Sequence, residues 1–388
     1  MTRQPNSPPP DQCPGVLATH QAADGAVARI RLPGGAITPA QLERLAQAAA
    51  EFGDGHLELT GRGNIQLRGV GDAIGVAAII DEAGLLPSSA HDKVRNIEVS
   101  PLTGRLGGAG DLRPLAADLD ERLRGHSQLS GLSGKFLFGL DDGRGDIMAQ
   151  RPDVGVVLAA GEDGAAASAD IVVDGVVVGA SGLDEAADVL LAIADEFLTR
   201  SAGVWRIAGL PDEVRSELVG SARRMFGRRA ARSVLPTPAT EPEPLVGWFD
   251  QDDGAVLLGA VVESARVPSR LAEFIAAIGA PVIITPHREI LICDLTEGVA
   301  ETVVRVLAPM GLIFDANSPW TRVSSCVGAP GCAKSHADVR ADLIAHVSDE
   351  QPTTREHWVG CARGCGTPTH DHLRVEATPE GYRSRRVS

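Results

Sequence analysis

The sequence predicts an α+β protein made of two pseudo-symmetric halves, in each of which a small α/β piece precedes a longer α+β piece. Three observations support this prediction: an internal repeat, a proline-rich segment between its two copies, and short strand patterns that alternate with helix patterns in both. At 388 residues the chain exceeds the usual size of one domain, so we expect two or more hydrophobic cores.

The two copies of the repeat follow the same order of elements. The first begins at Gly25 with GAVARIRLPGG and the second at Gly254 with GAVLLGAVVES, and both patterns indicate a strand, a turn, a helix and two further strands. Pro39 and Pro268 are each expected just inside the start of the helix, where proline is tolerated. Several aligned features at a nearly constant offset favour duplication over chance similarity between unrelated β-α-β units. The aligned segments are Thr60-Gly61-Arg62 with Thr285-Pro286-His287, and VRNIEVSPLTG from Val94 with TRVSSCVGAPG from Thr321.

Proline density marks the boundary between the halves. The segment Ser233–Gly247 is rich in proline and has no apolar periodicity, which is typical of a semi-rigid linker. Asp170–Leu198 indicates a pair of strands followed by a helix. The predicted organisation is a disordered leader (1–12), a first small α/β piece (13–85), a first larger α+β piece (86–232), the linker (233–246), a second small piece (247–312) and a C-terminal piece that carries most of the cysteines (313–388).

Composition indicates a globular enzyme of the cytoplasm. Hydrophobic residues make up 44% of the chain and charged residues 22%, with a net charge of −15. This charge argues against general binding to nucleic acid or to anionic membranes. The start of the chain has no secretory pattern, and no apolar run is long enough to span a membrane. Six cysteines in a chain of this length do not indicate a secreted disulfide framework, so we expect a reducing compartment.

Four cysteines near the C-terminus form the strongest chemical signal. Cys326 and Cys332 lie in CVGAPGC, and Cys361 and Cys365 lie in CARGC. Gathered thiolates bind soft metal centres, and the neighbouring glycines allow the backbone to bend closely around one. The first spacing differs from the commonest zinc pattern, so we predict a four-iron cluster, with zinc and inert buried thiols as the alternatives. Outside both motifs, Cys293 in EILICDL is expected to pack in the core.

Together these motifs resemble the nitrite/sulfite reductase superfamily. Within it, the chain is most similar to the branch that acts in aerobic cobalamin biosynthesis. The resemblance implies that each half pairs a ferredoxin-like subdomain with a larger α+β subdomain, and that the four cysteines bind a 4Fe–4S cluster. The stretches that carry it are CPGVL (Cys13–Leu17), LTGRGNIQLRGV (Leu59–Val70), KFLFGLDDGRGD (Lys135–Asp146), CVGAPGCAKSHADVRADLIA (Cys326–Ala345) and VGCARGCGTP (Val359–Pro368).

The resemblance also implies a set of cationic site residues. Arg62 and Arg95 lie where the family has tetrapyrrole- and anion-binding arginines, and Lys135 matches a lysine of its active-site pair. A substrate with many carboxylates needs such donors, and the guanidinium fork fits a carboxylate with two hydrogen bonds. Arg68 is a further candidate, since it shares a strand face with Gln66. We therefore predict substrate binding by Arg62, Arg95, Lys135 and Arg68, with Lys135 and Arg95 as catalytic residues; the alternative for each is an ordinary surface ion pair.

Two departures from the reductases favour an oxygenase. Leu137 stands where a sulfite reductase has its second lysine, and Gly134 stands where an arginine is common. The implied reaction is hydroxylation of precorrin-3A at C20, with a γ-lactone formed from the ring A acetate. It requires O2, electrons from NADH through an external reductase, and a mononuclear non-haem iron beside the cluster. The alternatives are a sirohaem-dependent nitrite or sulfite reductase and a non-catalytic scaffold stabilised by a metal.

The ligands of the mononuclear iron do not follow from the sequence. A facial triad needs two histidines and a carboxylate. His370, Asp371 and His372 lie close together after Cys365, but adjacent strand residues point to opposite faces. The other candidates are His336, four residues after Cys332, and His287, which is opposite Arg62 in the repeat.

Overall fold

The computed structural model describes residues 11, 13–159, 168–226 and 242–387, and it divides into two compact units. Unit 1 comprises Met1–Pro14, Arg31–Gly34 and Pro87–Ala239; unit 2 comprises Gly15–Ile30, Gly35–Leu86 and Thr240–Ser388. The predicted leader lies almost wholly outside the described residues, and so does most of the predicted linker. Among the described helices, none has the length and apolar character needed to cross a membrane.

Unit 2 contains two sheets that are related by the internal repeat. Each is built mainly from one copy, and each receives one short strand from the other copy: β13 pairs with β4, and β3 pairs with β14. This reciprocal exchange confirms that the two copies form equivalent halves. The first sheet has the order β1 (His20–Ala22), β2 (Gly25–Ile30), β5 (Ile65–Val70), β4 (His56–Leu59) and β13 (Arg266–Pro268). The second has the order β11 (Gly247–Asp250), β12 (Val256–Val262), β15 (Ile290–Leu295), β14 (Val282–Ile284) and β3 (Ala36–Ile37), with β16 (Leu312–Ile313) also paired to β12.

The helices of the two copies begin differently. In α1 (Pro39–Phe52), Pro39 is the first residue, as predicted, and Thr38 forms a capping box with Gln41. The expectation for Pro268 was wrong: it ends β13, and α6 (Ser269–Ala277) begins one residue later. Pro268 pairs with β4 in an extended conformation, and this pairing moves the helix start. The remaining repeat-related helices are α2 (Ala73–Glu82) and α7 (Glu297–Leu307).

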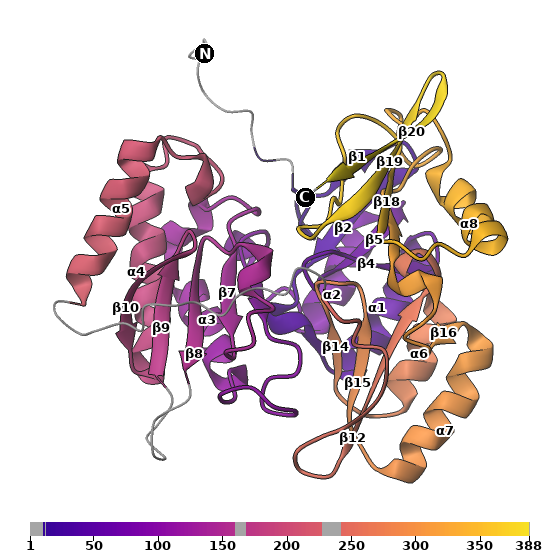
Figure 1. The fold of residues 1–388 in the computed structure, drawn as a ribbon, viewed down its shortest axis with the longest axis horizontal. Helices are drawn as coiled ribbons and strands as arrows, with labels where there is room; N and C mark the ends of the chain where they lie inside the picture. The colour runs from indigo at the N-terminus through magenta and orange to yellow at the C-terminus, as the bar shows by residue number, and fades with distance from the viewer. Residues whose placement is uncertain (1–10, 12, 160–167, 227–241, 388) are drawn as a thin grey trace. The chain divides into compact units, whose positions relative to one another are not determined.

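The C-terminal part of unit 2 is a four-stranded sheet. Its order is β17 (Val323–Ser325), β18 (Glu356–Val359), β19 (His372–Thr378) and β20 (Gly381–Val387). The first two pairings are parallel and the last is antiparallel. Helix α8 (Val339–Glu350) covers the sheet, with Leu343 and Val347 packed on Trp358 and Val375 (Figure 1). The carboxyl ends of β17 and β18 are adjacent, and both cysteine motifs begin there.

The described part of unit 1 contains a five-stranded sheet, and helices α3 (Arg113–Gly125), α4 (Leu183–Arg200) and α5 (Asp212–Met225) accompany it; Figure 1 shows them together. The order of the sheet is β10 (Val176–Ser181), β9 (Ser168–Val173), β8 (Val154–Ala159), β7 (Phe138–Asp141) and β6 (Ile97–Val99). The strand pair and helix predicted over Asp170–Leu198 are confirmed as β9, β10 and α4. The step from parallel to antiparallel pairing at β8–β9 repeats the step at β19–β20, which extends the pseudo-symmetry to the larger pieces.

Candidate metal centre

The four motif cysteines line one small cavity of unit 2. Cys326 directly follows β17, and Cys361 follows β18 after a single glycine, so the parallel pairing brings the two motifs together. The cavity has a volume of about 50 Å³, and Cys332 and Cys365 complete its sulfur lining. All four thiols are free, and Cys365 is the most exposed of them. The structure therefore gathers all four predicted ligands at one place.

The spacing of the thiols distinguishes between a single ion and a cluster. No three of the motif sulfurs lie within 4.8 Å of one another. Among the described residues, the side chains that bring three possible metal-ligand atoms this close are Asp141, Asp142 and Asp146. A tetrahedral zinc ion with Zn–S bonds of about 2.3 Å would hold its thiolates only about 3.8 Å apart. In a four-iron cluster each cysteine binds a different iron atom, so the sulfurs are farther apart. The donor set fits the cluster better than it fits zinc.

Backbone contacts fix the first motif against the second. The Gly360 N–H donates to Cys326 Sγ at 3.2 Å, and the Gly360 carbonyl accepts from the His336 N–H at 2.8 Å. A Cβ at position 360 would lie 1.8 Å from Ser335 Oγ, so only glycine fits there. This contact holds the two cysteine loops in register.

Two buried side chains hold the second motif. Arg374 donates to the Ala362 carbonyl at 2.9 Å and more weakly to the Cys361 carbonyl at 3.4 Å. His357 Nε2 lies 3.0 Å from the Cys365 carbonyl, and its Nδ1 lies 2.8 Å from Ser324 Oγ. Because a carbonyl only accepts, Nε2 must carry the proton and Nδ1 must accept from the hydroxyl. Burial lowers the pKa of His357 to about 3, which keeps this neutral tautomer.

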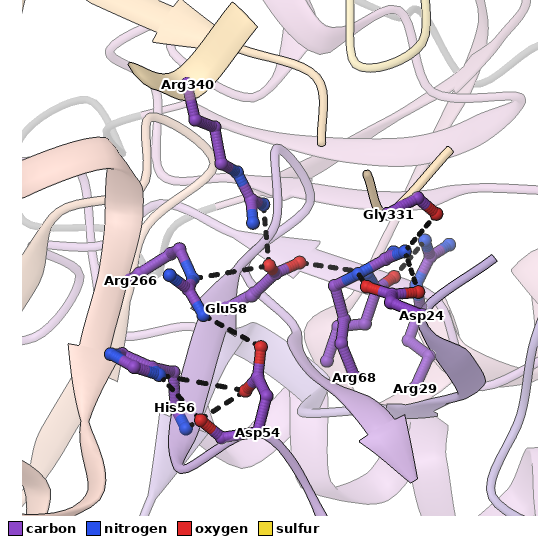
Figure 2. A network of polar contacts seen from close by, with 10 residues as sticks. Asp24, Arg29, Asp54, His56, Glu58, Arg68, Arg266, Gly331 and Arg340 are labelled. Atoms are coloured by element: carbon purple, nitrogen blue, oxygen red, sulfur yellow. Dashed lines mark hydrogen bonds and ion pairs between the residues drawn. The ribbon is translucent and has the colours of Figure 1, made fainter. Parts of the chain in front are cut away.

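Arg68 connects the first repeat to the first cysteine motif (Figure 2). Its guanidinium donates to both carboxylate oxygens of Asp24, at 2.9 and 2.8 Å, and to the Gly331 carbonyl at 3.1 Å. Gly331 directly precedes Cys332. The predicted substrate-binding residue Arg68 thus has its donors engaged inside unit 2, where it supports the cysteine loop.

Glu58 is the centre of a neighbouring polar network (Figure 2). It lies on β4 and accepts from Arg340 of α8 at 2.6 Å and from Gln66 at 3.1 Å. Arg266 of β13 lies 3.6 Å from the same carboxylate and donates to Asp54 at 2.7 Å. The network ties both repeats to the helix that follows the first cysteine motif.

Arg62 lies in the turn between β4 and β5. The Asn64 side chain donates to the Arg62 carbonyl at 2.9 Å and fixes this turn. Within the described part of the chain, the Arg62 guanidinium forms no hydrogen bond or ion pair, and its Nη1 atom is buried. A buried donor of a cation is costly to leave without a partner, unless a ligand supplies the missing acceptor.

Arg95 and Lys135 belong to unit 1, separately from the cysteines and Arg62. Arg95 is buried and forms a two-pronged ion pair with Asp120 of α3, at 2.6 and 3.0 Å. The Lys135 ammonium lies 3.7 Å from the centre of the Trp205 ring, which is a cation–π arrangement. Arg95 is neutralised within its own unit, and Lys135 is the more available cation of the two.

The histidine candidates for iron gather only in part. The rings of His287 and His370 are 5.8 Å apart, and those of His370 and His372 are 6.4 Å apart. Burial lowers the pKa of His287 to about 4 and that of His370 to about 3, so both are neutral. No three donor atoms of this group lie within 4.8 Å of one another, and Asp371 and His336 are exposed. The structure therefore assigns no iron ligands among the described residues.

Some functional residues escaped the sequence analysis. His357 and Arg374 hold the second cysteine motif, but they lie on β18 and β19, outside both cysteine motifs. The signal that could have found His357 is its position four residues before Cys361, on the strand that leads into the motif. The prediction for Cys293 is confirmed, since its side chain is fully buried in β15.

The fold is that of the NirA protein, and part of the chain matches a nitrite/sulfite reductase family. Residues 20–83 match the family described as "Nitrite/Sulfite reductase ferredoxin-like half domain". The solved structure of the Mycobacterium tuberculosis NirA protein superposes with a TM-score of 0.74 over 93% of this chain and 73% of that one, at 18% identity. These matches confirm the predicted α+β fold and its resemblance to the superfamily.

Among curated proteins, this chain is similar to the precorrin-3B synthase of Sinorhizobium sp. The two are 27% identical over 401 residues, which cover 95% of this chain and 81% of the relative. A sulfite reductase (ferredoxin) of Synechococcus elongatus is 25% identical over 46% of this chain and 30% of its own length. A ferredoxin–nitrite reductase of Leptolyngbya laminosa is 32% identical over 28% of this chain and 23% of its own length. The relatives confirm the prediction of an enzyme of the oxidoreductase class.

Proposed function

We propose that this protein converts precorrin-3A into precorrin-3B in aerobic cobalamin biosynthesis. The observation that carries the proposal is the extent of similarity: it covers 95% of the chain for the precorrin-3B synthase but under half of it for the sulfite reductase. The proposed reaction is hydroxylation at C20 with closure of a γ-lactone by the ring A acetate. One oxygen atom of O2 enters the product, the other leaves as water, and NADH supplies the electron pair through an external reductase.

We further propose that Cys326, Cys332, Cys361 and Cys365 bind a 4Fe–4S cluster. Their common cavity and their wide spacing support this assignment. When bound, the cluster would supply single electrons, and a mononuclear iron would supply the site of oxygen activation. The protein's own contribution is to hold the cysteine loops: Gly360 contacts Cys326, His357 holds the Cys365 carbonyl, and Arg68 holds the carbonyl before Cys332.

Substrate binding is assigned to cationic side chains, because precorrin-3A carries many acetate and propionate groups. Arg62 is the best supported, since its buried Nη1 lacks a hydrogen-bond partner in the described chain. Lys135 and Arg95 retain their proposed catalytic and binding roles from the family resemblance. Of these two, Lys135 is half-buried and among the described residues its ammonium contacts the Trp205 ring without an ion pair, so it can still bind a carboxylate.

The alternative is a sirohaem-dependent nitrite or sulfite reductase, which the partial similarities and the NirA-like fold favour. Two positions disfavour it. Leu137 has no exposed surface, so a second anion-binding lysine there would be buried in the core. A Cβ at Gly134 would lie 3.0 Å from the Cys13 side chain and 3.1 Å from Arg31 Nη2, so an arginine there would require these neighbours to shift.

The absorption spectrum of anaerobically purified protein separates these functions. A broad iron–sulfur shoulder without sharp tetrapyrrole bands supports the oxygenase. Sharp sirohaem bands in the purified enzyme would overturn it in favour of the reductase. Protein without iron would leave only a metal-independent or zinc-stabilised scaffold.

A further inference from the structure

The turn between β14 and β15 has the same construction as the turn that carries Arg62. In the first turn the Thr60 N–H donates to the Asn64 carbonyl at 2.9 Å; in the second the Thr285 N–H donates to the Glu289 carbonyl at 3.0 Å. The threonine hydroxyls accept from the N–H of the same partners, at 3.1 and 3.2 Å. The repeat therefore places two equivalent turns in unit 2, each at the end of a strand pair.

Arg288 occupies a special position in the second turn. Its φ is 65°, in the left-handed region, and the equivalent residue of the first turn is Gly63 with φ 60°. A side chain costs about 1 kcal/mol or more in this region, and such strain gathers at functional sites. The second copy thus carries an arginine where the fold itself would favour glycine.

The guanidinium of Arg288 lies between the Arg62 turn and the loop of the last cysteine. Its Nη2 donates to the Gly366 carbonyl at 3.2 Å, and Gly366 directly follows Cys365. The same Nη2 is 3.3 Å from where a Cβ on Gly61 would lie, next to Arg62. The two turns and the cysteine loop therefore meet at this arginine.

No carboxylate of the described chain forms an ion pair at this place. Among the described residues, neither Arg288 nor Arg62 forms an ion pair. The nearest acid on the turn, Glu289, accepts from the Thr285 hydroxyl and the Leu245 N–H instead. Burial lowers the pKa of Arg288, as expected for a cation without a counter-ion. The adjacent His287 and His370 are neutral, so they contribute no charge of either sign.

We propose that Arg288 is a second carboxylate-binding residue, which acts with Arg62 to hold acidic side chains of a tetrapyrrole beside Cys365. The tetrapyrrole class of the ligand rests on the proposed function. A metal ion is a poorer occupant, because the histidine donors are too widely spaced and the surrounding side chains are cationic. An anion supplies the charged acceptor that both guanidiniums lack.

The test compares tetrapyrrole affinity in two arginine variants of the full, cluster-loaded chain. The probe is uroporphyrin III, a metal-free tetrapyrrole with carboxylates on every pyrrole ring, and precorrin-3A is titrated in parallel. Arg288→Gln should raise the Kd for both about tenfold, the scale of one charge-assisted contact. Arg270→Gln is the matched control, since Arg270 is exposed on α6, where it pairs with Glu273 and lies over the Phe274 ring. It should leave the Kd within about twofold of wild type.

Each outcome decides a different claim. A wild-type Kd in Arg288→Gln overturns the assignment of Arg288, while binding by the wild-type chain leaves the proposed function standing. Failure of the wild-type chain to bind either tetrapyrrole overturns the proposed function, and the Arg288 assignment with it. If Arg288→Gln loses its iron–sulfur absorption, its Kd no longer tests the role of Arg288. The arginines of the wild-type chain are then modified with phenylglyoxal, with and without uroporphyrin III. Protection of the Arg288 peptide by uroporphyrin III supports the proposal, and equal modification with and without the probe overturns it.

Discussion

Replacing Arg68 with methionine tests whether the first repeat supports the cysteine loop. Methionine fills much of the space of the arginine stem but removes three hydrogen bonds, two to Asp24 and one to the Gly331 carbonyl. The Arg68 side chain is 7% exposed and that of Asp24 is 27% exposed, so the pair is largely desolvated. Removing one partner of a buried pair costs about 3–5 kcal/mol. Because water can still reach Asp24, we expect the lower end, about 3 kcal/mol.

The assay is urea unfolding under anaerobic conditions, followed by the visible absorption of the iron–sulfur centre. This signal reports on unit 2 alone, which avoids treating a two-unit chain as a single transition. Arg44→Met is the matched control in the same unit, because the Arg44–Glu82 pair is exposed at 35% and 67%. An exposed pair contributes only about 0.5 kcal/mol. Arg68→Met should also release iron to a chelator faster than the control. Equal stability of the two variants, within about 0.5 kcal/mol, would refute the supporting role of Arg68.

Three further predictions address the centre, the substrate and a buried acid. Cys361→Ser should abolish both the iron–sulfur absorption and turnover; full turnover without that absorption would contradict an electron-transfer role. Arg62→Gln should raise the Kd for precorrin-3A about tenfold with an unchanged cluster spectrum, and an unchanged Kd would count against the assignment. Burial raises the pKa of Asp146 from 3.8 to about 7, so this carboxyl lowers the stability of unit 1 progressively as the pH rises from about 4 to about 7. Asp146→Asn should therefore stabilise unit 1 by about 4 kcal/mol at pH 8 and hardly at all at pH 4. Urea unfolding measures this when it is followed by the fluorescence of a chain in which Trp205 is the only remaining tryptophan, and an equal gain at both pH values would disprove it.

The duplication and the cysteine site were predictable because both depend on local pattern and order. The two copies carry matching strand and helix signals, and each cysteine motif follows a strand directly. Parallel pairing of β17 and β18 then brings Cys326 and Cys361 together without further information.

The features that escaped prediction depend on contacts between distant residues. The exchange of β3 and β13 between the two sheets has no local signal, and it explains why Pro268 ends a strand instead of opening a helix. The side chain of Arg68 is engaged by Asp24, 44 residues away, and that of Arg95 by Asp120, 25 residues away. A strand pattern shows which face such an arginine occupies but not which acid it meets.

Alignment of the repeat found the right turn but not its most informative residue. The repeat aligns His287 with Arg62, whereas the cation of this turn, which forms no ion pair within the described chain, is Arg288. Its significance depends on a left-handed backbone and on contact with Gly366, and neither is encoded in residue spacing.

Incubation of the purified enzyme with precorrin-3A, an NADH-linked reductase and ¹⁸O₂ tests the proposed function most directly. Mass spectrometry should show a product heavier than precorrin-3A by one oxygen atom, with that atom derived from ¹⁸O₂, and no product without O2 or NADH. Unchanged precorrin-3A, together with reduction of nitrite or sulfite by the same protein, would contradict the account.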